Sequence, residues 1–181
     1  MPRHGFIHDK LDIKFLILYI MARVAAPIGF LTLTDLVMID SGVDYFDFTE
    51  AVPELVEAGL LSCREERYAI TDMGRRDGAE CESSLPLSVR AKCDGKLTEL
   101  NAALKRAAQV RSQVLPRKDG GCTLRLCLDD DAGNLLTLEL CCPTEEQAND
   151  LAEGFLAHPE PTYNAVLDLL LAQAEKERTH E

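Results

Sequence analysis

The feature that most limits how this chain folds is an uninterrupted apolar run near its start, residues 15–21 (FLILYIM). Water excludes such a run, so it must be covered by lipid or by the rest of a protein core. A membrane span needs about 20 apolar residues, and Asp12, Lys14 and Arg23 flank this run closely. The run therefore predicts a helix buried inside a protein core.

Length and composition place the chain among folded, intracellular proteins. With 181 residues, 46% hydrophobic and 28% charged, it is long enough for one compact domain or two small ones. The start (MPRHGFIHDK) lacks the apolar segment and cleavage site of a secretory signal. The seven cysteines are an odd number. We therefore expect reduced thiols and a cytoplasmic location.

The charge is strongly acidic and unevenly distributed. The net charge is −12. Residues 1–83 hold 8 Lys and Arg against 15 Asp and Glu, residues 84–120 hold 8 against 3, and residues 121–181 hold 3 against 13. Bulk attraction would not bring such a chain to nucleic acid. Any DNA contact needs a local basic patch, and the middle segment is the most basic part.

The first 83 residues read as a succession of short elements. Apolar spacing predicts helices at about 9–25, 33–41 and 45–58, a hairpin of 60–64 and 67–71, and a helix at 72–82. Helix–helix–turn–helix–hairpin–helix is the order of a winged helix-turn-helix domain. The string from Tyr68 to Gly74 (YAITDMG) agrees, because Thr71 is placed to cap the last helix. We predict a winged-helix domain in residues 1–83.

A second domain, residues 84–181, is predicted to begin with a long linking helix over about 84–112. Its apolar positions recur at spacings of four and three, at Cys93, Leu97, Leu100, Leu104 and Ala107. Two interpretations stay open. The helix packs on its own domain, or Leu97, Leu100 and Leu104 form the seam of a homodimer.

The rest of the second domain is predicted to be a β-hairpin followed by two helices. A loop at 131–133 pairs Asp130 with Asn134, and counting outward pairs Leu128 with Leu136 and Arg125 with Glu139. The same register pairs Leu126 with Leu138, Leu124 with Leu140 and Cys122 with Cys142. Helices follow at 144–157 and 162–177, the second with Tyr163, Val166, Leu167, Leu170, Leu171 and Ala174 on one face. The fold class is therefore α+β, with a ββαα C-terminal region.

The chain resembles an uncharacterised family of small bacterial winged-helix proteins. The element order, the apolar first helix, the YAIT–G string and the SLPLSVR segment at 84–90 carry this resemblance. It spans nearly the whole chain, and it implies a transcriptional regulator whose partners are double-stranded DNA and a second copy of the chain.

A winged helix reads DNA with its third helix in the major groove and with wing residues on the backbone. The candidate DNA-binding residues are Tyr45, Thr49, Arg64, Arg67, Arg75 and Arg76. The four arginines can also be read simply as solvated surface charges.

The third helix departs from that expectation. It carries Asp44, Asp47, Glu50, Glu54 and Glu57 and has no Lys, Arg, Asn or Gln. Pro53 predicts either a kink or a later start. These features favour the alternative of a protein-interaction module that does not bind DNA.

Other chemistry is not indicated. The hairpin register puts Cys122 and Cys142 on one face and Cys127 and Cys141 on the other, so four thiolates could not converge on one zinc ion. The sequence offers neither a phosphate-binding glycine loop nor a set of catalytic residues. We expect no enzyme activity, no metal and no cofactor.

Overall fold

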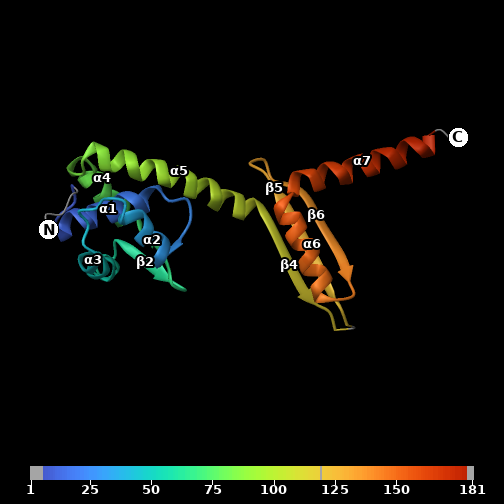
Figure 1. The fold of residues 1–181 in the computed structure, drawn as a ribbon, viewed down its shortest axis with the longest axis horizontal. Helices are drawn as coiled ribbons and strands as arrows, with labels where there is room; N and C mark the ends of the chain where they lie inside the picture. Colours follow the sequence, from blue (N-terminus) through green and yellow to red (C-terminus); the bar gives the residue numbers. More distant parts are fainter. Residues whose placement is uncertain (1–5, 119, 179–181) are drawn as a thin grey trace. The chain divides into compact units, whose positions relative to one another are not determined.

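A computed structural model describes residues 6–118 and 120–178 as a mixed α+β protein. The chain forms two compact units, residues 1–105 and 106–181, each with its own hydrophobic core (Figure 1). Two small three-stranded sheets, one in each unit, account for the β content of these residues. The domain boundary expected between residues 83 and 84 stays a prediction.

The first unit holds four short helices, a 3-10 turn, a small sheet and most of a long helix. They are α1 (Lys10–Arg23), β1 (Ile28–Gly29), α2 (Phe30–Val37), α3 (Tyr45–Glu57), β2 (Leu61–Arg64), β3 (Arg67–Ile70), α4 (Asp72–Cys81), η1 (Glu82–Ser84) and α5 (Leu87–Gln109). The sheet has the order β1-β3-β2 and is antiparallel throughout. The second helix begins three residues earlier than predicted, since Phe30 already packs against the core.

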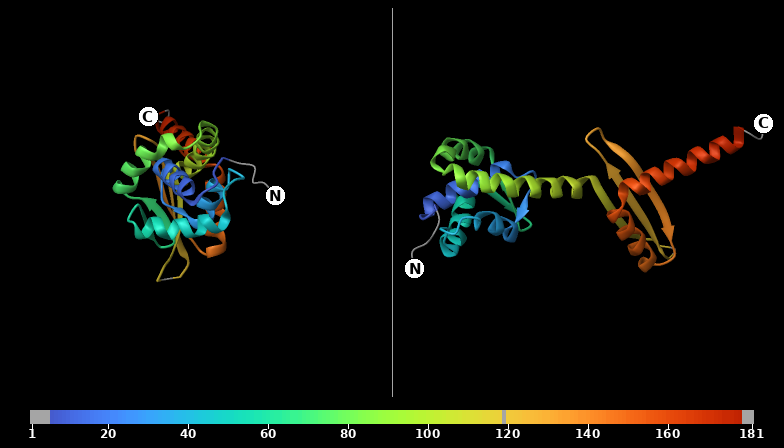
Figure 2. Two further views of the ribbon diagram at one scale, coloured as in Figure 1. Left: turned by 90° about the vertical axis from the view of Figure 1, so that its left-hand side faces the viewer. Right: turned by 45° about the horizontal axis from the view of Figure 1, so that its top comes forward.

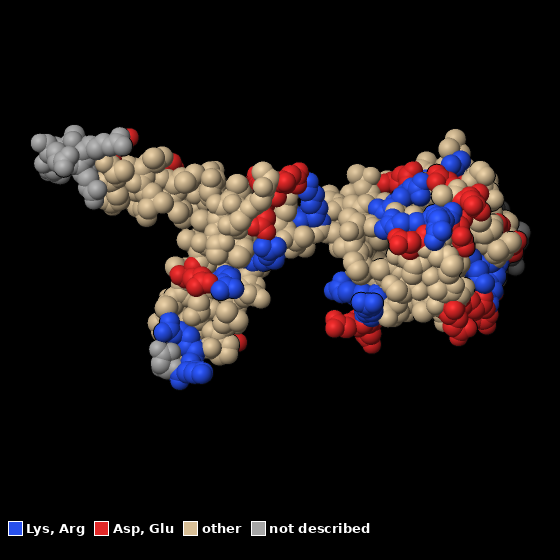
Figure 3. Space-filling view, turned by 180° about the vertical axis from the view of Figure 1, so that it is seen from behind, with Lys and Arg blue, Asp and Glu red and all other residues tan. Residues whose placement is uncertain are grey.

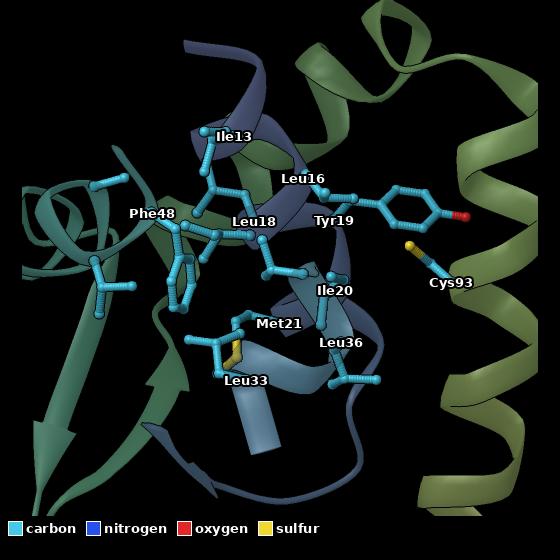
Figure 4. Packing of buried hydrophobic residues seen from close by; sticks show 14 of the residues in the cluster. Ile13, Leu16, Leu18, Tyr19, Ile20, Met21, Leu33, Leu36, Phe48 and Cys93 are labelled. Carbon is cyan, nitrogen blue, oxygen red and sulfur yellow. The ribbon is translucent and has the colours of Figure 1, made fainter. Parts of the chain in front are cut away.

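The apolar run forms the centre of the first unit, as predicted. Every residue from Leu16 to Met21 is buried, so this stretch of α1 has no face toward solvent. The helices α2, α3 and α4, strand β3 and η1 all contact α1. Figure 4 shows Phe48, Leu33 and Leu36 directed at α1 from its neighbours. A helix that is apolar all round has to be enclosed in this way.

Asp40 ties the segment before α1 to the turn that follows α2. Its carboxylate is 3% exposed and accepts hydrogen bonds from the backbone N–H groups of Phe6 (2.9 Å), Ile7 (3.3 Å) and Gly42 (3.0 Å). A buried carboxylate is tolerated only when such donors replace water. Asp40 therefore joins the segment before α1 to the turn between α2 and α3.

The string from Tyr68 to Gly74 clamps α4 to the end of α3. The Thr71 hydroxyl donates to the Gly59 carbonyl (2.7 Å) and accepts from the Gly74 N–H (3.0 Å), as the predicted cap requires. At Gly74 an added Cβ would lie 2.1 Å from the Leu60 carbonyl oxygen. The glycine is therefore needed for the close approach of the two segments.

Helix α5 docks on the first unit along the apolar positions read from the sequence. Val89, Cys93 and Leu97 are buried in the core, and Leu100 and Leu104 pack half-buried against it. Cys93 faces Tyr19 across the contact with α1 (Figure 4). The helix therefore packs within its own chain, but on the first unit and not on the rest of the predicted domain 84–181. Leu97, one of the three residues of the predicted dimer seam, is already buried by contacts within the single chain.

Polar contacts reinforce the same docking surface. The Tyr19 hydroxyl donates to Asp94 of α5 (2.7 Å), and the Arg23 guanidinium lies 3.7 Å over the Tyr19 ring. Arg23 also pairs with Glu82 (2.8 Å). Burial, with the hydrogen bond to Asp94, raises the pKa of Tyr19 to about 12.

The second unit is a three-stranded antiparallel sheet with two helices. Its elements are β4 (Val110–Pro116), β5 (Cys122–Asp129), β6 (Asn134–Cys142), α6 (Glu145–Ala157) and α7 (Pro159–Arg178), with the strands in the order β4-β5-β6. One face of the sheet packs with α6 around Leu124, Leu126, Leu128 and Phe155. The right-hand view in Figure 2 shows α6 lying against this sheet.

The predicted hairpin register is confirmed over most of its length. The four leucine and cysteine pairs and the pair of Arg125 with Glu139 all form as expected. The pair predicted nearest the loop is wrong. Asn134 is opposite Asp129, because a bulge follows Leu128 and the Asp130 carboxylate instead accepts from the Ala132 and Gly133 N–H groups.

The prediction of a two-stranded C-terminal region is also wrong. The sequence pattern places residues 110–112 in the linking helix, but they begin β4, which pairs with β5 from Val110 to Pro116. The alternation of Val110, Ser112 and Val114 with Arg111 and Gln113 is the signal for this strand.

Two further details concern the helices. The last helix starts at Pro159, because prolines are tolerated in a first turn.

Within the described ranges, every helix is too short or too polar to span a membrane.

We predict opposite effects of alanine at two glycines of this fold. Gly74→Ala should lower the free energy of unfolding by about 3 kcal/mol, because its methyl group would overlap the Leu60 carbonyl. Gly95→Ala should raise it by about 1 kcal/mol, because Gly95 lies in exposed α5 with open space around it. Urea unfolding followed by circular dichroism measures both. Shifts in the same direction for the two variants would contradict the close contact at Gly74.

Candidate nucleic-acid interface

Helix α3 presents aromatic residues at its first turn. Asp44 caps the helix by accepting from the Phe46 (2.8 Å) and Asp47 (3.2 Å) N–H groups. Phe48 is buried, whereas Tyr45 is 50% exposed and Phe46 76% exposed. Ring contacts connect Phe46 through Tyr45, Phe48 and Phe30 to Tyr68 of β3, with centroid separations of 5.4–6.3 Å. The exposed rings of Tyr45 and Phe46 are therefore connected by tilted and edge-on ring contacts to the buried ring of Phe48.

Two of the acidic residues of α3 are paired with α1. Lys10 contacts both Glu50 (2.9 Å) and Glu54, and Lys14 contacts Glu54 (2.6 Å). The hydrogen bond from Lys10, with that from Lys14, lowers the pKa of Glu54, and the hydrogen bond from Lys10 to Glu54 raises the pKa of the lysine. The negative charge of this part of α3 is thus compensated within the fold.

Pro53 lies inside α3, which runs unbroken from Tyr45 to Glu57. Of the two alternatives, a kink or a later start, the later start is therefore wrong. Pro53 is exposed, while Ala51, Val52 and Leu55 carry the contact with the core. The Asp44 cap, and not the proline, marks where the helix begins.

The hairpin of β2 and β3 carries a paired set of charges. Arg64 and Arg67 are directly opposite each other, and both are exposed. The connecting residues Glu65 and Glu66 have positive φ angles of 49° and 59°, the conformation of a two-residue turn that prefers Asn-Gly. Arg67 also donates to the Pro27 carbonyl (3.3 Å), which directs it toward the segment before β1.

The arginines of α4 lie elsewhere. Arg75 donates to the Ala22 carbonyl (3.0 Å) at the end of α1, and Arg76 donates to the Asp72 carbonyl (3.3 Å) of its own helix. In Figures 1 and 2, α3 and α4 lie on opposite sides of α1. The structure thus brings together Tyr45 with Thr49, and Arg64 with Arg67, while Arg75 and Arg76 belong to another surface. In the view of Figure 3, basic and acidic side chains lie next to each other on this unit.

Sequence reasoning missed Lys10 and Lys14, which face α3, and Phe46, its most exposed aromatic ring. A signal was present for the lysines. Lys10 and Lys14 are four residues apart, and so are Glu50 and Glu54, so each pair occupies one face of its helix.

The cysteines offer no common ligand site. All seven are free thiols. Cys122 and Cys142 are buried in the second core, whereas Cys127 is half-buried and Cys141 exposed. Within residues 6–118 and 120–178, no cluster of three or more His, Cys, Asp or Glu residues is placed to hold a metal ion.

The pairing between α1 and α3 predicts a pH response. In a Lys10→Met/Lys14→Met variant, the lowered pKa of Glu54 should return toward its ordinary value near 4.5. In the wild type, the stabilisation from this pairing is present above about pH 4.5 and is lost as the pH falls through the lowered pKa. Carboxyl chemical shifts followed by NMR titration report this pKa. Lys92→Met, on exposed α5, is the matched control and should leave the titration of Glu54 unchanged.

Comparison with known proteins identifies a family without assigning an activity. No curated protein and no solved structure matches the chain. A family model described as "Domain of unknown function (DUF4364)" matches residues 13–170. The match covers most of both units and confirms the resemblance to an uncharacterised domain family. The chain belongs to the DUF4364 family.

Proposed function

We propose that this protein is a winged-helix transcriptional regulator that binds double-stranded DNA as a homodimer. The order α1-β1-α2-α3-β2-β3-α4 supports the winged-helix assignment. So does a short strand, β1, that pairs with the second strand of an antiparallel hairpin. In such domains α3 enters the major groove and the hairpin forms the wing.

The observation that carries this proposal is the internal neutralisation of α3. Five carboxylates on a recognition helix would repel phosphates. Here Glu50 and Glu54 are engaged by Lys10 and Lys14, and Asp44 is engaged as the helix cap. This leaves Asp47 and Glu57 as the two carboxylates of α3 to which we assign neither an ion pair nor a capping role. The repulsion between α3 and DNA phosphates is therefore weaker than its five carboxylates alone would imply.

The contacts we propose divide by chemistry. Arg64 and Arg67 on the wing contact phosphates, because their side chains are exposed and positively charged. Tyr45 and Thr49 at the start of α3 face the base edges. Arg75 and Arg76 lie beyond α1 and supply at most long-range attraction.

Salt-dependent DNA binding tests these roles. Fluorescence anisotropy with a random duplex should show binding at low salt that weakens steeply as salt increases. Arg64→Ala/Arg67→Ala should reduce the slope of log affinity against log salt by about 2, because each arginine neutralises one phosphate. Arg75→Ala/Arg76→Ala removes the same charge from α4 and should leave the slope unchanged. Absence of binding by the wild-type protein at every salt concentration would refute the DNA-binding function.

The wing turn offers a gain-of-function test. Glu65→Asn/Glu66→Gly should raise stability by about 1 kcal/mol, because Asn-Gly suits two successive positive φ angles. It should also tighten DNA binding at low salt, since two negative charges beside the arginines are removed. Glu65→Gln/Glu66→Gln is the control. It should tighten DNA binding without the gain in stability, and equal stability of the two variants would contradict the turn argument.

A homodimer suits this function, because two copies related by a two-fold axis can engage two DNA half-sites one helical turn apart. The seam of Leu97, Leu100 and Leu104 predicted for this dimer stays a prediction. Leu97 is only 3% exposed in the single chain, so a seam that used it would require α5 to leave its own core.

A second candidate function is a protein-interaction module. The exposed rings of Tyr45 and Phe46, with Leu31 at 80% exposure, favour this function. An open hollow lined by Phe30, Leu31 and Tyr68 lies beside the hairpin. Exposed aromatic residues are typical anchors of protein interfaces. Flat anisotropy traces with DNA at all salts would favour this function over the first.

A further inference from the structure

The last helix, α7, packs against its own unit at its start and is exposed to solvent further along. Pro159 is buried, and Tyr163 packs against the second core. The carboxylate of Glu160 forms a two-point contact with Arg106, with Nη2 and Oε2 2.8 Å apart. That contact lowers the pKa of Glu160 to about 2. From Leu167 to Glu175, however, every residue is exposed.

The exposed part of α7 is strongly apolar. Leu169, Leu170 and Leu171 are 61–62% exposed and Leu167 is 40% exposed. Leu167, Leu170, Leu171 and Ala174 continue the helix face that starts with Tyr163 and Val166. We call these four residues the leucine face. It extends the apolar surface by which α7 joins its own core, and Figure 3 shows the described part of α7 as largely uncharged in that view.

The second unit buries few hydrophobic side chains relative to the number that it leaves exposed. Among the residues that the structure describes, its core contains nine buried hydrophobic residues, and nine large hydrophobic residues of the same unit are exposed. The first unit has 21 buried in its core and seven exposed. Small units with a limited core usually gain the missing burial by association. An exposed apolar surface of this kind marks an interaction site.

We propose that the leucine face is the homodimer interface and that its occupant is the α7 helix of a second copy, packed antiparallel. The charge of α7 favours this partner over others. Over its whole length, residues 159–178, α7 holds four acidic residues (160, 168, 175 and 177) against Lys176 and Arg178, a net charge of −2. This net negative charge disfavours anionic lipid and nucleic acid, since helices that lie on membranes are rich in basic residues beside the apolar face.

The sequence of the face is self-complementary. In an antiparallel pair centred between Leu170 and Leu171, each Leu170 meets the second copy's Leu171, and each Leu167 meets the second copy's small Ala174. In the same register Asp168 meets Gln173, and Glu175 meets Val166. No two acidic groups are opposed, so the pair forms without like-charge repulsion.

This proposal rests on the homodimer part of the proposed function and is independent of DNA binding. Sedimentation of the full-length protein at micromolar concentration should give twice the 20.0 kDa chain mass. Leu170→Glu/Leu171→Glu should give a monomer with an unchanged circular dichroism spectrum, because both positions are exposed. Leu169→Glu is the matched control. Leu169 is equally exposed but lies about 150° around the helix from the centre of the face, so this variant should remain a dimer.

The outcomes separate the two ideas. A monomeric wild-type protein would overturn both the homodimer and the role of the leucine face as its interface. Binding of that monomer to neutral phosphatidylcholine vesicles would do the same, because it would assign the face to lipid. A dimer that survives Leu170→Glu/Leu171→Glu would overturn the leucine face and leave the homodimer standing. Hydrogen exchange of the wild type needs no variant. Protection of amides 167–175 should increase with protein concentration, and protection that is independent of concentration would overturn the proposal.

Discussion

The burial of α1 is the constraint on which the rest of the first unit depends. With Leu16 to Met21 covered on every side, the helix requires neighbours all round, and α2, α3, α4, η1 and α5 supply them. Each neighbour contributes one apolar face and keeps its polar face toward water. The polar contacts of Tyr19, Arg23 and Asp40 then fix how α5, η1 and the segment before α1 are held against this centre.

The same central helix determines the charge of the surface that α3 presents. The polar start of α1 places Lys10 and Lys14 against Glu50 and Glu54. A helix that is acidic in isolation therefore becomes partly neutral in the fold, because ion pairs within the chain replace repulsion toward a polyanion. Net charge alone is a poor guide to binding when the groups that carry it face one another.

The two units achieve stability by different means. The first encloses an apolar helix and has a large core for its length. The second covers one face of its sheet with α6 and leaves the leucines of α7 in water. The hydrophobic contribution to folding scales with the apolar area removed from water. The first unit is therefore complete within one chain, whereas the second has apolar area still available for association.

The sequence by itself determined the elements whose signals are local. Hydrophobic periodicity located α1, α3 and α6, cap residues such as Thr71 marked helix starts, and cross-strand matching set most of the β5–β6 register. The apolar positions of α5 were also found, but their partner was not, since periodicity identifies a buried face without identifying what covers it. Only the tertiary structure decided that Leu97 is buried in the first core, that residues 110–116 extend the sheet, that Lys10 meets Glu54, and that Arg75 lies apart from α3. Each of these depends on residues distant in the sequence, whose proximity is fixed by packing and carries no local signature.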